Sequence, residues 1–120
     1  MAWGSDTAST QLTSITTEQF FSQTPQLNPG ELAHCQVTVD FPTTPTDNAI
    51  ISVYTTLDDT SENWDDVPWM QFTLLNDTDP NSVSFLVQGV YKFRVGVQRD
   101  GSTDTLTSAD MSHRVDGVTL

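Results

Sequence analysis

The residues of this chain with the most versatile chemistry are two histidines and one cysteine. His34, His113 and Cys35 are the candidates for a metal ligand, a base or a nucleophile. A zinc site gathers three or four such ligands, and here only His34 and Cys35 are near each other in the sequence. Neighbouring side chains in a strand point to opposite faces, so these two cannot hold one ion together. We therefore expect structural or surface roles for the histidines and no bound metal.

Carboxylates form a second group with chemical potential. Two adjacent pairs, Asp58-Asp59 and Asp65-Asp66, lie in an acidic loop over residues 58–68. General acid–base catalysis needs carboxyl groups in fixed geometry with shifted pKa values, and an exposed, flexible loop supplies neither. The sequence also lacks a nucleophile elbow, a glycine-rich phosphate loop and a zinc-protease helix. We expect no catalytic residues, no enzymatic activity and no cofactor.

Calcium binding is a further reading of the acidic segments. Hard cations prefer clustered carboxylates and carbonyls, but the loop over residues 58–68 lacks the alternate spacing and the glycine of a calcium loop. Asp77, Asp79 and Asn81 have alternate spacing, although turns rich in Asp and Asn often share it. A solvated acidic loop is the simpler interpretation of both segments.

Two tryptophans make the acidic loop a candidate ligand loop. Trp64 and Trp69, beside Asp65 and Asp66, have the composition of a surface that stacks on a sugar ring. The alternative is that Trp69 packs on the body of the protein while Trp64 covers an open edge. The sequence leaves both interpretations open.

A third group of residues is a candidate for partner binding. Residues 1–15 are polar, with isolated apolar positions at Trp3, Leu12 and Ile15, and this predicts an extended N-terminal arm whose apolar residues contact another protein. Lys92 and Arg94 share the outward face of a predicted strand. They either pair with nearby acids, which contributes about 0–1 kcal/mol at a surface, or form part of an interface.

The elements that must position these residues are strands. Threonine and serine are abundant, whereas the whole chain has three Glu and one Lys, so strong helix formers are scarce. Apolar and polar residues alternate in short segments that are separated by turn residues. We predict one β-sandwich domain over residues 16–120, with strands at 17–22, 31–41, 48–57, 69–75, 82–87, 90–98 and 103–111, and with a hairpin at Asp100-Gly101 joining the last two.

Charge and cysteine content exclude several classes of partner. The net charge is −12 with four basic residues, so clustered cations for nucleic acid or for an anionic membrane are missing. Cys35 has no second cysteine to pair with, which favours assembly in a reducing cytoplasm. The first residues lack the pattern of a signal peptide, and no apolar run approaches the length of a membrane helix. We expect a protein that is neither exported nor inserted in a membrane.

Residues 82–101 resemble the strand–corner–strand region of fibronectin type III and other immunoglobulin-like domains. Tyr91 matches the tyrosine-corner position, where the hydroxyl binds nearby backbone. Cys35 has no partner in the strand of Phe93 and Val95, and no core tryptophan stands in the strand over residues 48–57. The resemblance is therefore to the disulfide-free, immunoglobulin-like sandwich, and a jelly roll is the alternative architecture.

Size, acidity and the predicted arm are also similar to those of the decoration, or cement, proteins of tailed phages. This resemblance implies docking on the major capsid protein of an assembled virion, as a homo-oligomer such as a trimer or at hexamer centres. It assigns a role to no single residue. A carbohydrate-binding or host-recognition module is the alternative from another class, and a neck or tail-completion component is a further one.

Overall fold

The computed structural model describes residues 7–8, 11–27, 34–41, 48–58, 63–75, 82–100 and 106–116, and all regular structure in these ranges is strand. Among the described residues, no helix has the length and hydropathy needed to cross a bilayer. The all-β class predicted from the sequence is confirmed. The strands are β1 (Thr7–Ala8), β2 (Leu12–Ile15), β3 (Gln19–Phe20), β4 (His34–Asp40), β5 (Ala49–Thr56), β6 (Met70–Leu74), β7 (Ser82–Gln88), β8 (Lys92–Arg99) and β9 (Leu106–Asp116).

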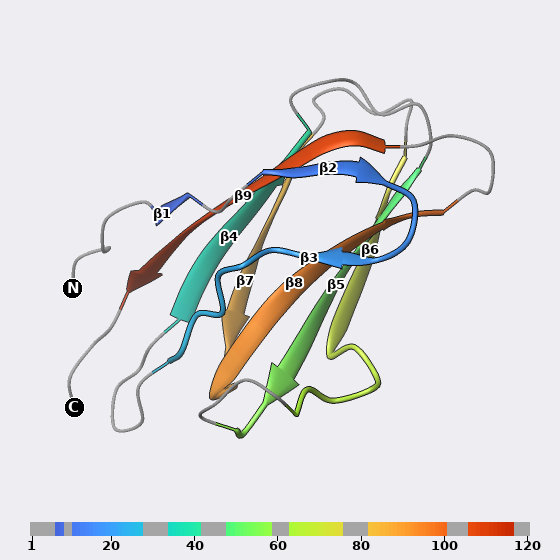
Figure 1. Cartoon of the computed structure of the whole chain (residues 1–120). Helices are drawn as coiled ribbons and strands as arrows, with labels where there is room; N and C mark the ends of the chain where they lie inside the picture. The colour runs from blue at the N-terminus through green and yellow to red at the C-terminus, as the bar shows by residue number, and fades with distance from the viewer. Residues whose placement is uncertain are drawn as a thin grey trace.

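The strands form two antiparallel sheets (Figure 1). One sheet has the order β1-β9-β4-β7, and β2 pairs with β9 along the same side as β1, at another part of its length. The other sheet has the order β3-β8-β5-β6. The predicted antiparallel β-sandwich is therefore confirmed.

The chain changes sheet at every step from β2 onward except between β5 and β6. This alternation is typical of the double-sheet jelly roll, the alternative that the sequence left open. It also shows that the predicted hairpin at Asp100-Gly101 is wrong, because β8 and β9 lie in different sheets. Both edges of β8 are occupied, by β3 and by β5, so β9 has no edge there to pair with. Gly101 itself lies outside the described residues.

Alternate positions of the central strands fill the space between the sheets. In β4, Cys35, Val37 and Val39 have no exposed surface, while Gln36 and Asp40 are exposed, as the sequence pattern predicts. Strands β5, β8 and β9 contribute in the same way. The remaining buried apolar residues include Phe21, Leu27, Phe41, Ala49, Ile51, Val53, Leu74, Val87, Phe93, Val95, Val97, Leu106, Ala109 and Met111.

The predicted arm over residues 1–15 is wrong for its last residues. Leu12 and Ile15 belong to β2, where they pair with Ala109 and Leu106 of β9. Ile15 is fully buried in the core and Leu12 packs against it, so neither stands out from the sandwich to bind a partner. Two residues three apart point to opposite faces of a regular strand, but Ser14 has a φ of 50°. This irregularity lets both side chains face the core and removes the alternation that would reveal a strand.

The other partner-binding residue of the predicted arm, Trp3, lies outside the described residues, and its role stays a prediction. Thr7 and Ala8 pair with His113 and Ser112 of β9, so the sheet extends close to the start of the chain. A deletion of residues 1–15 would remove both β1 and β2. It would therefore test the sandwich as well as an arm.

Burial of Ile15 makes a prediction for stability. Replacing Ile15 with alanine should lower the free energy of unfolding by about 2–5 kcal/mol, because the change leaves a cavity in the core. Urea denaturation followed by tryptophan fluorescence measures the change. The matched control is Thr13→Ala, an exposed residue of the same strand, which should change stability by no more than about 0.5 kcal/mol. Equal effects of the two substitutions would mean that β2 is not part of the folded core.

Burial of Cys35 makes a prediction for reactivity. The thiol has no exposed surface, and burial raises its pKa from 9.0 to about 12. Since the thiolate is the reactive form, iodoacetamide at pH 8 should modify the native protein at least about a hundredfold more slowly than the protein unfolded in urea. Mass spectrometry of quenched samples gives both rates. A native rate close to the unfolded one would contradict the placement of Cys35 in the core.

Candidate functional site

A group of aromatic side chains surrounds an arginine on the outer face of the sheet β3-β8-β5-β6. The guanidinium carbon of Arg94 lies 3.6 Å from the ring centroid of Phe20, 4.9 Å from that of Trp64 and 5.8 Å from that of Tyr54. Together with Glu18, these residues are called the aromatic–arginine cluster below. Cation–π contacts at this range stabilise by about 0.5–1 kcal/mol each at exposed sites and by more where water is excluded.

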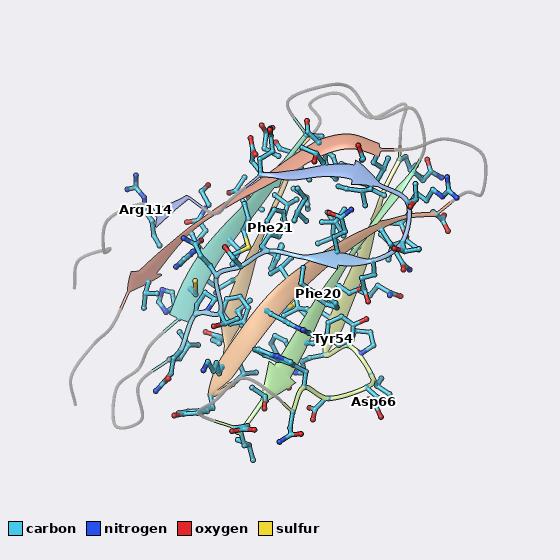
Figure 2. The ribbon with its side chains drawn as sticks, viewed as in Figure 1. Phe20, Phe21, Tyr54, Asp66 and Arg114 are labelled. Carbon is cyan, nitrogen blue, oxygen red and sulfur yellow. The ribbon has the colours of Figure 1, made fainter. Side chains whose placement is uncertain are left out.

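The cluster faces outward because the strands alternate. Tyr54 follows the core residue Val53, and Arg94 lies between the core residues Phe93 and Val95. Tyr54 and Arg94 are directly opposite each other in the pairing of β5 with β8. Figure 2 shows Phe20 and Tyr54 close together over this sheet, and their rings meet edge to face with centroids 5.6 Å apart.

The ring of Phe20 lies against β8 at Gly96. The two residues are Cα partners in the pairing of β3 with β8. A Cβ atom at Gly96 would stand 2.8 Å from Cε1 of Phe20, closer than real Cβ contacts come, and 3.1 Å from an oxygen of Glu18, which is tighter than most. Only glycine therefore leaves room for the Phe20 ring to lie against the backbone of β8 and reach Arg94.

Glu18 supplies the polar partner of the cluster. The hydroxyl of Tyr54 donates to the Glu18 carboxylate, at 3.0 and 3.1 Å from its two oxygens. Burial, followed by this hydrogen bond and the negative charge of Glu18, raises the pKa of Tyr54. Burial lowers the pKa of Arg94, while the negative charges of Glu18 and Tyr54 act in the opposite direction. An arginine guanidinium stays protonated in proteins. The Nε atom of Arg94 is buried and has no hydrogen-bond partner among the described residues.

The segment after β5 holds Trp64 in place. Thr55 and Asp65 are joined twice, by a hydrogen bond from the Thr55 hydroxyl to the carboxylate and by one from the Asp65 N–H to the Thr55 carbonyl. The hydroxyl of Thr56 donates to the Asn63 carbonyl at 2.6 Å, and the N–H of Trp69 donates to Val53 at 2.7 Å. The predicted loop over residues 58–68 is thus fastened to β5 at Asn63 and Asp65, and its end is fixed by the bond from Trp69.

The four residues predicted as a ligand loop do not form a single site. Trp64 is half-buried and lies against Arg94, and Asp65 is held by Thr55. Asp66 is exposed on the loop in Figure 2, and Trp69 keeps 46% of its surface exposed just before β6. Trp64 instead contacts Arg94. The sequence predicts Trp64 in a ligand loop and Arg94 on a separate partner-binding surface.

The predicted surface pair of Lys92 and Arg94 is wrong for Lys92, which is only 7% exposed. The chain after β3 continues along β8, where Gln26 forms a bridge with Lys92 and the Leu27 N–H donates to the Tyr91 carbonyl. This segment covers that end of the strand. The tyrosine-corner hydrogen bond proposed for Tyr91 stays a prediction.

Sequence reasoning missed three residues of the site: Glu18, Phe20 and Tyr54. The available signal was Tyr54, an aromatic residue at an outward position of a strand whose inward positions are Ile51 and Val53. Phe20 gave no such signal, because its neighbour Phe21 is the one that enters the core. Which of two adjacent phenylalanines faces inward depends on the register with β8.

Side chains that could hold a metal ion do not gather in the described ranges. No three His, Cys, Asp or Glu side chains of those ranges gather closely enough to hold a metal ion. What the site offers is a half-buried cation among aromatic rings, with one carboxylate beside it. That arrangement is suited to contact with another surface.

Comparison with known proteins gives a fold likeness. Neither a known protein family nor a curated protein matches the sequence. A solved structure of Bacillus endospore appendages, described as a novel family of disulfide-linked pili, is similar to this chain with a TM-score of 0.58 and 13% sequence identity. The similarity covers 99% of this chain and 88% of that one. At this identity the likeness concerns the fold alone.

The contact between Gly96 and Phe20 can be tested with a double-mutant cycle. Gly96→Ala should lower the free energy of unfolding by about 1–3 kcal/mol, because the added methyl group displaces the Phe20 ring. In a Phe20→Ala background the same substitution should cost much less, since the obstructing ring is gone. Urea denaturation of the four proteins gives the coupling energy. Equal costs in both backgrounds would mean that Phe20 does not lie on Gly96.

Proposed function

We propose that this chain is a non-enzymatic structural module that docks on a larger protein assembly through the aromatic–arginine cluster. The observation that carries the proposal is Arg94 held among Phe20, Tyr54 and Trp64 on an outer sheet face. Outward positions of an antiparallel sheet are commonly polar and solvated. Trp, Tyr and Arg are the residues that most often dominate the binding energy of protein interfaces.

The cluster is prepared for binding in two respects. Each of its aromatic side chains and Arg94 is half-buried, so the sandwich holds part of each surface while the rest stays open to contact. The hydrogen bonds that fasten residues 63–69 to β5 order Trp64 before a partner arrives. Ordering a side chain in advance reduces the entropy lost on binding.

Within this class we propose decoration of a bacteriophage capsid, with the major capsid protein lattice as the surface on which the chain docks. A net charge of −12 and a single small sandwich fit an accessory protein that sits on the outside of a virion and keeps it soluble. Assembly would take place in the host cytoplasm. A neck or tail-completion role would use the same docking chemistry at another place on the particle.

A filament subunit is the second candidate function, and the fold likeness to the endospore appendage structure favours it. Those pili are described as disulfide-linked. The only cysteine of the present chain, Cys35, is buried and its pKa is raised, so in this fold it is not available to link subunits. A filament of this chain would therefore be held by noncovalent contacts.

Carbohydrate binding through the loop has less support from the geometry. Stacking on a sugar needs an open ring face beside free polar groups, whereas Trp64 lies against Arg94 and Asp65 is held by Thr55. Trp69 is the more exposed of the two tryptophans, but it is not part of the cluster.

The proposed docking can be tested by co-sedimentation with undecorated capsids, assembled from the major capsid protein encoded in the same genome. Trp64→Ala and Arg94→Ala should each weaken binding about 30-fold, which corresponds to about 2 kcal/mol for a central interface residue. Trp69→Ala is the matched control and should weaken binding less than threefold by the same scale. Urea denaturation of each variant shows that the sandwich is still folded.

Other outcomes of this experiment separate the candidates. Capsid binding that survives both cluster substitutions would contradict docking through the cluster. A wild-type chain that ignores capsids but polymerises into fibres would favour the filament subunit. Selective binding on a glycan array that is lost in Trp64→Ala would favour the carbohydrate module instead.

A further inference from the structure

The two sides of the sandwich end in very different edge strands. On one side, β1 has two residues, β2 is interrupted at Ser14 with its φ of 50°, and the segment after β3 runs along β8 through Pro25. Irregular backbone and proline are common devices that keep an edge from pairing with another chain. On the other side stand β6 and β7, which are regular.

Strand β7 is the longer of the two regular edges. All seven of its residues, Ser82–Gln88, pair with β4 without a bulge, and within the described residues no strand pairs with its other edge. The strand contains no charged residue and no proline, although the chain as a whole has a net charge of −12. In the part of the chain that the structure describes, this edge therefore has none of the usual protections against pairing with another chain.

Apolar side chains remain partly exposed at the edge formed by β7. Val83 and Phe85 face the core but are only half-buried, whereas their partners in β4, Val39 and Val37, have no exposed surface. On the outer face, Leu86 keeps 43% of its surface exposed. Phe85 packs on Phe72 of β6 with ring centroids 5.0 Å apart, so the two sheets are joined at this side of the sandwich. A further strand beside β7 would cover Val83, Phe85 and Leu86.

The charge pattern indicates which protein would supply the further strand beside β7. Two copies of an acidic chain repel each other over most of their surface, and an uncharged edge is where they can approach closely. A basic partner, by contrast, would find no carboxylates on this edge to attract it. The edge therefore fits a second copy of this chain better than it fits a protein selected for opposite charge.

The sequence of β7 is also suited to pairing with itself. When two copies run antiparallel about a two-fold axis at Phe85, Val83 lies opposite Val87 of the other copy and Ser84 lies opposite Leu86. Side chains that face the core in one copy then face the core in the other, because partners in this register differ by an even number of positions. The outer face brings no like charges together.

From these observations we propose that β7 is a self-association surface, on which a second copy pairs antiparallel and extends the sheet β1-β9-β4-β7 across both molecules. The contact is isologous and closes as a dimer. Main-chain hydrogen bonds along the edge supply the attraction, as in other cases of strand addition. This inference concerns the purified chain and does not depend on which assembly the chain joins.

Sedimentation velocity over a range of protein concentrations tests the proposal. The wild-type chain should pass from monomer to dimer as its concentration rises. Leu86→Glu should raise the dissociation constant at least tenfold, because the two introduced carboxylates lie near the same two-fold axis. Gln36→Glu is the matched control, since it adds the same charge to the outer face of β4, beside Leu86 but away from the edge. It should leave the dissociation constant within twofold of the wild-type value.

A compensating substitution tests the register. In the proposed dimer, residue 84 of one copy lies opposite residue 86 of the other, so Ser84→Lys added to Leu86→Glu should restore most of the lost affinity. Oxidative cross-linking gives a second readout, in which a mixture of S84C and L86C proteins should form more disulfide dimer than either protein alone. Cys35 does not interfere, because it is buried.

Three results would overturn the proposal. The first is a wild-type chain that stays monomeric up to millimolar concentration. The second is a dimer that Leu86→Glu does not weaken, which would place the contact elsewhere. The third is growth into open polymers, because a two-fold contact at β7 closes on itself. Circular dichroism of each variant confirms that a change in association does not come from unfolding.

Discussion

Every second side chain of the central strands must be apolar and must fit between the two sheets, and the rest of the structure depends on this constraint. In β4, β5 and β8 these positions hold small and branched residues without exposed surface, such as Val37, Ile51 and Val95. Their burial fixes the pairing register, since a shift by one residue would turn the apolar set toward water. The positions of all outward residues follow from that register.

The aromatic–arginine cluster is one consequence of this register. Tyr54 and Arg94 meet because β5 and β8 are paired in the frame that buries Val53 and Val95. Gly96, two positions further along β8, then lies under Phe20. A cation with a strong hydrogen-bonding head group is thereby held beside aromatic rings, with the Glu18 carboxylate as the nearby opposite charge. The result is an outer sheet face with the composition of a protein interface.

The same architecture explains why the two sides of the sandwich differ. One side is closed by the N-terminal strands, whose irregular backbone follows β9 and β8 without leaving a regular free edge. The other side ends in β6 and β7, whose outer edges carry no charge. We propose that the face carrying the aromatic–arginine cluster contacts a different protein and that the edge of β7 contacts a second copy of the chain.

The fold class and most strands could be predicted from the sequence, because alternation in the strands over residues 34–40 and 92–99 reports directly on which side chains are buried. The tyrosine-bearing strand β5 was equally clear. The N-terminal strand β2 was not predicted, because Ser14 interrupts the alternation of its side chains. The predicted hairpin at Asp100-Gly101 was wrong, because an Asp-Gly pair indicates only a local turn and β9 lies in the other sheet. Local turn chemistry does not say whether the next strand joins the same sheet.

The sequence by itself therefore determined that the chain is an acidic, all-β sandwich with alternating inward residues, since these properties depend on composition and on the period of a strand. Only the tertiary structure decided that Trp64, Phe20 and Tyr54 gather around Arg94 and that Lys92 is covered. Those contacts join residues from separate strands and a loop. Their proximity depends on strand order and register, which are set by the packing of the whole core and not by any local pattern.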